Sequence, residues 1–303
     1  MRISDSITVL KDGKVTGTVY PKDVDEYKLA SLMVGREVFL KVDKPKKDLS
    51  ENTLEIKDLS VANDDGIEKV KGVNLSIRRG EILGLAGVAN NGQKELVEAI
   101  FGLRKIQKGQ AIYKNQNITN SNPTQLRKMG IGYVPQDRIN VGSNPEAPMW
   151  ENAVMGYHIT HGFKSKILFD HSKAYKFTKD IKERFNVKMS SIYSPAKTLS
   201  GGNLQKLIIG REFSQEFQLL IIEDPTRGVD IGATEFIWKE ILEIAKAGAA
   251  ILLVSHDLTE IMSISDRIAV IYDGEITGIL DADKAEENQI GLLMTGGKVR
   301  ENA

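Results

Sequence analysis

Two features in the C-terminal part of this chain could do chemistry on a phosphorylated ligand. The first is a pair of carboxylates, Glu223 and Asp224, directly after the apolar run 219–222. The second is a pair of glycines before the helix-compatible stretch 203–213. Glycine lets the backbone approach a ligand closely, the preceding serine can cap the helix, and the helix N-terminus suits a phosphate. The residues of this second feature are Leu199, Ser200, Gly201, Gly202 and Asn203.

A third feature lies upstream, where a glycine loop follows the strand-like run 82–85. The loop follows the phosphate-binding pattern G-x-x-x-x-G-K-[ST], in which the lysine reaches the phosphates and the hydroxyl binds Mg²⁺. Gln93 stands at the lysine position and Lys94 at the hydroxyl position. One helical step turns a side chain by about 100°, so Lys94 is not expected to replace the missing lysine. The sequence therefore predicts a phosphate cradle without its fixed cation, formed by Gly87, Val88, Ala89, Asn90, Asn91, Gly92, Gln93, Lys94 and Glu95.

The segment 199–203 and the acidic strand end together resemble the signature and Walker B motifs of the ABC ATPases. In that family two domains meet head to tail, and each ATP lies between the P-loop of one domain and the signature of the other. The resemblance implies that Ser200, Gly201 and Gly202 contact an ATP held by a partner domain. It also implies ATP and Mg²⁺ as cofactors, with both bound weakly at the altered P-loop of this chain.

The resemblance assigns three further residues by motif position. Gln136 stands where the Q-loop glutamine senses the metal, and His256 stands at the H-loop position, where it would contact the γ-phosphate. Asp230 takes the D-loop place and would reach across to the partner domain. We expect Gln136 and His256 to join the carboxylate pair in catalysis.

The Walker B carboxylates depart from the family pattern in their order. Glu223 replaces the metal-holding Asp, and Asp224 replaces the catalytic Glu. Catalytic geometry is sensitive on the ångström scale, so we expect slow hydrolysis at this site and doubtful binding of Mg²⁺ by Glu223 and Gln136. One hypothesis for the reversal is that Lys94 pairs with Glu223 and makes the site weakly dependent on Mg²⁺.

The elements that must position these residues follow an α/β pattern from residue 54 onward. Apolar strands alternate with amphipathic helices, which predicts a largely parallel central sheet, with antiparallel strands early in the chain. Residues from about 146 to 198 lack strand runs and look helical. The fold class expected from the resemblance is a P-loop ABC ATPase with a mixed central sheet, an antiparallel β-subdomain and a small helical subdomain. The expected strands are 54–56, 73–77, 82–85, 111–113, 131–134, 219–222, 251–254 and 268–272.

An internal repeat links the two ends of the chain. Residues 3–19 align with residues 264–280 at an offset of 261, and both copies predict a β-hairpin with an Asp-Gly turn followed by a short helix. We therefore expect residues 1–38 to be the closing segment of a preceding ABC domain, 39–53 to be a linker and 54–300 to be the second domain. The chain would then be the C-terminal half of a tandem protein or a naturally split half.

Composition narrows the function classes. The chain has 303 residues, and its 41 basic side chains are balanced by 41 acidic ones. This lack of net positive charge does not favour a nucleic-acid-binding surface. It has no cysteine, which fits a reducing compartment. No apolar run approaches the roughly 20 residues that span a bilayer, so a membrane role would require a partner.

Across 54–300 the chain resembles the second nucleotide-binding domain of tandem ABC importers for nucleosides and simple sugars, closest to the nucleoside branch. The resemblance implies transmembrane permease subunits and a substrate-binding protein as partners, and a peripheral place on the cytoplasmic face of the membrane. A ribose- or galactose-like sugar importer and a regulatory domain with little hydrolysis remain alternatives. An ATPase of DNA repair is disfavoured, because about 60 residues between Gln136 and Leu199 leave no room for a long coiled coil.

Overall fold

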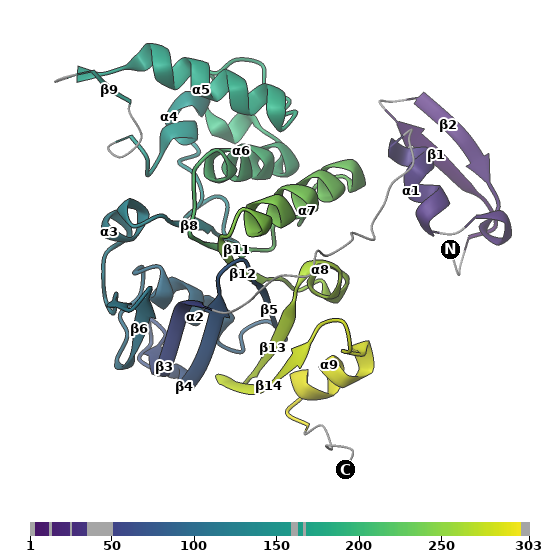
Figure 1. Ribbon diagram of the computed structural model, residues 1–303. Helices are drawn as coiled ribbons and strands as arrows, with labels where there is room; N and C mark the ends of the chain where they lie inside the picture. Colours follow the sequence, from purple (N-terminus) through teal and green to yellow (C-terminus); the bar gives the residue numbers. More distant parts are fainter. Residues whose placement is uncertain are drawn as a thin grey trace.

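The structure is a computed structural model that describes residues 4–11, 14–24, 26–34, 51–158, 163–165 and 168–297 (Figure 1). The N-terminal hairpin and the core contain β1 (Ile7–Lys11), β2 (Lys14–Val19), a 3₁₀ turn (Pro21–Asp23), α1 (Glu26–Val34), β3 (Asn52–Ala62), β4 (Glu68–Arg78), β5 (Ile82–Ala86), α2 (Gln93–Ile100), β6 (Lys108–Tyr113), β7 (Gln116–Asn117), α3 (Pro123–Lys128) and β8 (Ile131–Val134). The remaining elements are α4 (Met149–Val154), β9 (Lys164–Ser165), β10 (Leu168–Phe169), α5 (His171–Arg184), a 3₁₀ turn (Ala196–Thr198), α6 (Gly201–Phe213), β11 (Leu219–Glu223), α7 (Ile231–Lys246), β12 (Ala250–Val254), α8 (Leu258–Ile264), β13 (Arg267–Tyr272), β14 (Glu275–Asp281) and α9 (Glu287–Met294).

A six-stranded sheet in the order β14-β13-β5-β12-β11-β8 forms the centre of the fold. Only the β13–β14 pair is antiparallel in this sheet, as the α/β pattern predicts. Successive side chains of a strand point to opposite faces. Leu219 and Ile221 accordingly belong to the core shared with the antiparallel sheet, whereas Leu220 and Ile222 belong to the core on the other face. Burial on both faces explains why this strand reads as a continuous apolar run.

A four-stranded antiparallel sheet, in the order β4-β3-β6-β7, shares one core with α2 and the central sheet. The other core joins the central sheet to α6 and α7. The expected mixed central sheet and antiparallel β-subdomain are therefore confirmed.

The regular structure described between 146 and 198 is mainly helical, and α4 and α5 pack against α6 at one end of the structure (Figure 1). The expectation that this stretch lacks strands is wrong in one place, where β9 and β10 pair as two-residue strands. Strands this short carry no periodicity that a sequence pattern can reveal.

A buried ionic cluster anchors α6 to the rest of the fold. Glu212 is fully buried and accepts hydrogen bonds from Arg127 Nη1 at 3.0 Å and from Arg211 Nε at 2.9 Å. The hydroxyl of Tyr157 donates to the same carboxylate. Since these partners come from α3, from α6 itself and from the segment after α4, the cluster fixes α6 relative to both its neighbours.

The repeat found in the sequence is also a repeat of backbone geometry. Val9 pairs with Gly17 in the first hairpin, and Val270 pairs with Gly278 in the last, 261 residues later. The register shifts after this pair in both hairpins. The predicted hairpins are therefore confirmed, although the first Asp-Gly turn, at 12–13, and most of the expected linker lie outside the described residues.

Equivalent threonines tie each hairpin to the helix that follows it. Thr16 Oγ1 donates to Val9 O at 3.2 Å and reaches Leu32 O at 3.5 Å. Thr277 Oγ1 donates to Val270 O at 3.2 Å and to the carbonyl of the helix residue at 293, also at 3.2 Å. The two units thus share their side-chain contacts as well as their strands.

Across the described residues, no helix combines the length and apolar character needed to cross a bilayer.

Candidate functional site

Three of the four predicted catalytic residues meet at the carboxyl edge of the central sheet. β8, β11 and β12 are parallel neighbours, so the residues that follow them lie at the same edge. Gln136 Nε2 donates to Asp224 Oδ2 at 2.8 Å. The backbone N–H of His256 donates to Asp224 Oδ1 at 3.0 Å, and its ring Nδ1 lies 3.0 Å from Oδ2. Asp224 is therefore the shared contact between the glutamine and the histidine.

The fourth predicted catalytic residue, Glu223, lies deeper. It is 5% exposed, and its Oε1 accepts hydrogen bonds from the hydroxyl of Tyr133 at 2.6 Å and from the backbone N–H of Gln136 at 3.3 Å. Burial raises the pKa of Glu223 to about 7, against the lowering effect of these two hydrogen bonds. This carboxyl is therefore poised to change charge near neutral pH.

The hypothesis that Lys94 pairs with Glu223 is wrong. Lys94 lies on the exposed side of α2, and its Nζ is 3.8 Å from Oε1 of Glu98, one helical turn away. Side chains at i and i+4 share a helix face, and this local partner holds the ammonium away from the buried carboxylate.

Gln93 stands at the position of the missing P-loop lysine, and its uncharged amide forms a brace, meaning two hydrogen bonds to the backbone of the loop. Its side chain is buried, its Nε2 donates to Val88 O at 2.9 Å, and its Oε1 accepts from the backbone N–H of Asn91 at 3.1 Å. A Cβ on Gly87 would lie 2.5 Å from Gln93 Nε2, so glycine is required there for the brace to fit. The loop thus holds its shape through an amide, and no positive charge from position 93 reaches the cradle.

The closing hairpin supports the same loop from outside. Asn91 Oδ1 accepts from the backbone N–H of Asp273 at 2.8 Å, and Asn91 O accepts from Gly274 N at 3.0 Å. Asp273 and Gly274 form the tight turn between β13 and β14, and both have positive φ, at 46° and 84°. Gly92 also has a positive φ, and a Cβ on it would lie 2.3 Å from Lys69 O. The loop is therefore packed between two backbone segments.

An open pocket of about 860 Å³ lies beside the loop. It is lined by Ala89 of the loop and by Gln136, Asp224 and His256. The structure thus brings together one loop residue and three predicted catalytic residues on one cavity.

The side chains around this pocket make a poor Mg²⁺ site by themselves. Mg²⁺ prefers six oxygen ligands in octahedral geometry. Both oxygens of Asp224 are engaged by Gln136 and His256, and Lys94, at the position of the pattern's hydroxyl, carries an ammonium that cannot act as a ligand. Among the described residues, no group of three His, Cys, Asp or Glu side chains could hold a metal ion. Binding of Mg²⁺ here would have to depend on nucleotide oxygens and water.

The predicted signature segment begins α6 two residues earlier than expected. Gly201 and Gly202 lie inside the helix, and Ser200 is its N-cap, with Oγ 3.4 Å from Asn203 N and 2.9 Å from Asn203 Nδ2. A Cβ on Gly202 would lie 2.8 Å from Gly228 O. Glycine at 202 is therefore explained by close approach of two backbones, which local propensity does not reveal.

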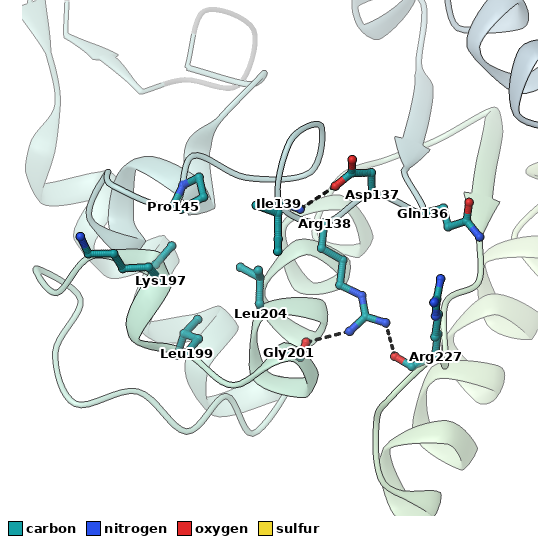
Figure 2. Close-up of a pocket in the computed structure, with 11 residues that line it drawn as sticks. Gln136, Asp137, Arg138, Ile139, Pro145, Lys197, Leu199, Gly201, Leu204 and Arg227 are labelled. Atoms are coloured by element: carbon teal, nitrogen blue, oxygen red, sulfur yellow. Dashed lines mark hydrogen bonds between the residues drawn. The ribbon is translucent and has the colours of Figure 1, made fainter.

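A second open pocket, of about 800 Å³, separates this segment from the loop that carries Gln136 (Figure 2). Leu199 and Gly201 line one side of it, and Gln136 and Arg138 line the other. The predicted D-loop residue Asp230 lies outside this pocket and caps α7, accepting from Ala233 N at 2.9 Å.

Sequence reasoning missed two residues that shape the site. Tyr133, the hydroxyl donor to Glu223, lies opposite Ile221 in the strand next to β11, so the pairing of neighbouring strands could have identified it. Glu260 is buried, lines the pocket beside the glycine loop, and accepts from Thr226 Oγ1 at 2.8 Å. Burial raises the pKa of Glu260. No motif marks it, because a single Glu in a helix is usually a surface residue.

Comparison with known proteins places these motifs in context. The profile of the ABC transporter family matches residues 70–227. The nucleoside import ATP-binding protein NupA of Lactococcus lactis is 40% identical over 99% of this chain and 59% of its own length. The guanosine import ATP-binding protein NupO of Bacillus subtilis matches with the same figures. The glucose import ATP-binding protein TsgD13 of Haloferax volcanii is 40% identical over 97% of this chain and 54% of its own length.

The chain thus spans about three fifths of the length of the curated relatives that it matches. Among solved structures, the ATP-binding subunit of an ABC transporter superposes with a TM-score of 0.66 at 22% identity, covering 80% of this chain and 99% of the other. An ATP-binding cassette bound to ADP and phosphate gives a TM-score of 0.64 at 22% identity, covering 76% and 98%. The fold is that of the P-loop ABC ATPases.

Proposed function

This chain belongs to the ABC transporter family, and we propose that it is the ATP-binding part of an importer that couples ATP hydrolysis to nucleoside uptake. The names of the relatives support nucleosides, since NupA is a nucleoside and NupO a guanosine import protein, each 40% identical to this chain. Import of a simple sugar is the second candidate, because the glucose import protein is equally similar and a ribose import protein of Lactococcus lactis is 35% identical.

We further propose that residues 1–38 close a preceding ABC domain and that residues 54–300 are the second domain of a tandem protein. The support is the repeat of register, bulge and threonine contacts between the first and last hairpins. The last hairpin closes the domain that contains the glycine loop, so its first copy would close an equivalent domain.

Within such a pair, we propose that the two nucleotide sites differ. The observation that carries this proposal is the uncharged brace at position 93. Gln93 uses both the NH2 and the carbonyl oxygen of its side-chain amide for contacts inside the loop, and Lys94 contacts Glu98 instead of the cradle. Phosphoryl transfer depends on positioning and on charge stabilisation, so a loop without its lysine should bind ATP and Mg²⁺ weakly and hydrolyse ATP slowly.

The signature segment, in contrast, supports a competent nucleotide site at the P-loop of the preceding domain. Ser200 caps α6, and Gly201 and Gly202 leave the first two positions of the helix without side chains. The N-terminus of a 13-residue helix attracts phosphate. We propose that this segment completes the site whose P-loop belongs to the preceding domain, with Asp230 reaching toward that domain.

The proposed assembly includes permease subunits in the membrane and a substrate-binding protein outside it. The chain would lie peripherally at the cytoplasmic face of the membrane, and no nucleic-acid partner is proposed. The surface from Gln136 to Asn152 would contact a permease subunit, a placement that rests on motif position.

ATP turnover tests the proposal most directly. We would measure it for this chain alone and mixed with the preceding domain, using wild type, Ser200→Arg and the control Ser190→Arg, which places the same side chain at an exposed serine outside the signature. We expect turnover only in the mixture, lost in Ser200→Arg and kept in Ser190→Arg. Turnover by the chain alone at the level of the mixture would refute the proposed asymmetry. Tolerance of Ser200→Arg in the mixture would instead favour a regulatory domain.

A further inference from the structure

Arg138 lies where three loops of the site meet (Figure 2). Its Nη1 donates to Gly201 O at 3.0 Å, and its Nη2 donates to Arg227 O. The arginine belongs to the loop after β8, Gly201 begins α6, and Arg227 follows β11. One guanidinium therefore joins the loop of Gln136 to the signature segment and to the turn after the carboxylate pair.

The bonding of this guanidinium is governed by geometry more than by charge. Within the part of the chain that the structure describes, Arg138 forms no ion pair, and its side-chain hydrogen bonds go to two backbone carbonyls. Burial, together with the neighbouring charge of Arg227, lowers the pKa of Arg138. The planar fork of an arginine holds two acceptors in a fixed geometry, whereas the ammonium of a lysine is a point charge on a flexible stem and does not reproduce that geometry.

The base of this bridge is firmly held. Ser143 Oγ donates to Arg138 O at 2.6 Å, and Asp137 Oδ1 accepts from the backbone N–H of Asn140 at 2.9 Å. Arg138 is two residues from Gln136 on the same short loop. Because these hydrogen bonds hold the backbone between them, a displacement of Gln136 would also displace the guanidinium of Arg138.

This contact links the start of α6, where the signature segment lies, to that loop, and Arg211 Nη1 links the last turns of α6 to the same loop through Gly142 O at 3.0 Å. Two other side chains tie α6 to the turn after β11, through Gln205 Nε2 to Pro225 O at 3.1 Å and through Lys206 Nζ to Asp230 Oδ2 at 3.0 Å. Neither involves the loop of Gln136. Among the described residues, Arg138 provides the side-chain hydrogen bond between 136–139 and 199–203.

We propose that Arg138 is a positioning residue that couples the two nucleotide sites. Gln136 lines the pocket beside this domain's own glycine loop, and Ser200 to Gly202 serve the nucleotide of the preceding domain. Arg138 holds the signature segment at a fixed place relative to Gln136. A change at Gln136 therefore shifts the segment that acts on the nucleotide of the preceding domain. This inference rests on the proposed division of labour between the two sites.

The test compares Arg138→Lys and Arg138→Met with Lys197→Met. Lys197 lines the same pocket but bonds to Glu146 and touches neither carbonyl, so this control removes one positive charge without breaking the bridge. In the mixture with the preceding domain, we expect both Arg138 variants to lower kcat by about ten-fold or more, with little change in KM for ATP. A loss of about ten-fold corresponds to one charge-assisted hydrogen bond, and methionine removes both bonds of the bridge. Lys197→Met should keep both constants.

Wild-type kcat in Arg138→Lys would overturn the inference, because charge alone would then suffice. An equal fall in Lys197→Met would overturn it as well, since the pocket's charge would be responsible. Amide hydrogen exchange at Leu204, in the first turn of α6, provides a readout in the chain alone. We expect faster exchange there in both Arg138 variants, at an unchanged Tm.

This exchange measurement separates the inference from the proposed function. If the wild-type mixture shows no turnover, the proposed function fails, and exchange then decides whether Arg138 holds the segment. Unchanged exchange at Leu204 would overturn that role whatever the turnover.

Discussion

The buried carboxyl of Glu223 should make the stability of the metal-free protein fall as pH rises toward neutrality. Its pKa is about 7 in the folded chain and 4.5 for the free side chain. When the folded pKa is the higher one, the stabilising contribution is present below pH 4.5 and is lost as pH rises through about 7. A difference of about 2.5 units corresponds to about 3 kcal/mol.

The variant Glu223→Gln isolates this effect. Glutamine has nearly the same shape and can still accept the hydrogen bonds from the hydroxyl of Tyr133 and the backbone N–H of Gln136, but it cannot ionise. We expect the variant and the wild type to have similar unfolding free energies at pH 4.5. At pH 8 the variant should be more stable by about 3 kcal/mol.

Urea unfolding at several pH values in the presence of a chelator measures the difference. Glu243→Gln serves as the control, since this exposed carboxylate forms a local ion pair with Lys246 on its own helix and its loss should change stability by no more than about 1 kcal/mol. A stability difference between Glu223→Gln and wild type that is the same at pH 4.5 and pH 8 would refute the reasoning. It would mean that the carboxyl is hydrated in the folded protein or keeps a cation beside it.

Three further outcomes are expected. Glu212→Gln should lose about 3–5 kcal/mol of unfolding free energy in urea titrations, because it leaves buried guanidinium groups without their carboxylate, whereas Glu240→Gln, at a partly exposed pair, should lose about 1 kcal/mol or less. Gly202→Ala should lower Tm, since its Cβ would lie 2.8 Å from Gly228 O and the overlap costs roughly 1–3 kcal/mol; an unchanged Tm would show that the two backbones can separate. Gln93→Lys should tighten ATP binding to the chain about ten-fold in calorimetric titrations at low salt, by placing a cation at the cradle, and unchanged affinity would show that the phosphates do not lie there.

The sequence predicted the buried strands well because their burial on both faces leaves continuous apolar runs. Residues 219–222 and 251–254 are such runs, and both are central strands. The convergence of Gln136, Asp224 and His256 also followed from sequence, since motif order along parallel strands brings their carboxyl ends to one edge of the sheet.

Contacts to backbone atoms could not be predicted in the same way. Arg138 bonds to carbonyl groups, so no complementary residue type signals the contact. The start of α6 was placed too late because glycine is a weak helix former, and its reason at position 202 lies in a loop distant in the sequence. Lys94 was assigned the wrong partner because a local contact one turn along the helix competes with a buried carboxylate.

The support that the β13–β14 turn gives to the glycine loop has a consequence for biosynthesis. The hydrogen bond from Asp273 N to Asn91 Oδ1 spans 182 residues, which is most of the folded unit. At a translation rate of roughly 5–20 residues per second, the loop would wait about 10–40 s for its support to emerge from the ribosome. Closing so long a segment also slows folding. The glycine loop would therefore be among the last parts of this domain to mature, so a nascent chain that lacks the final hairpin would not yet hold the loop in its finished shape.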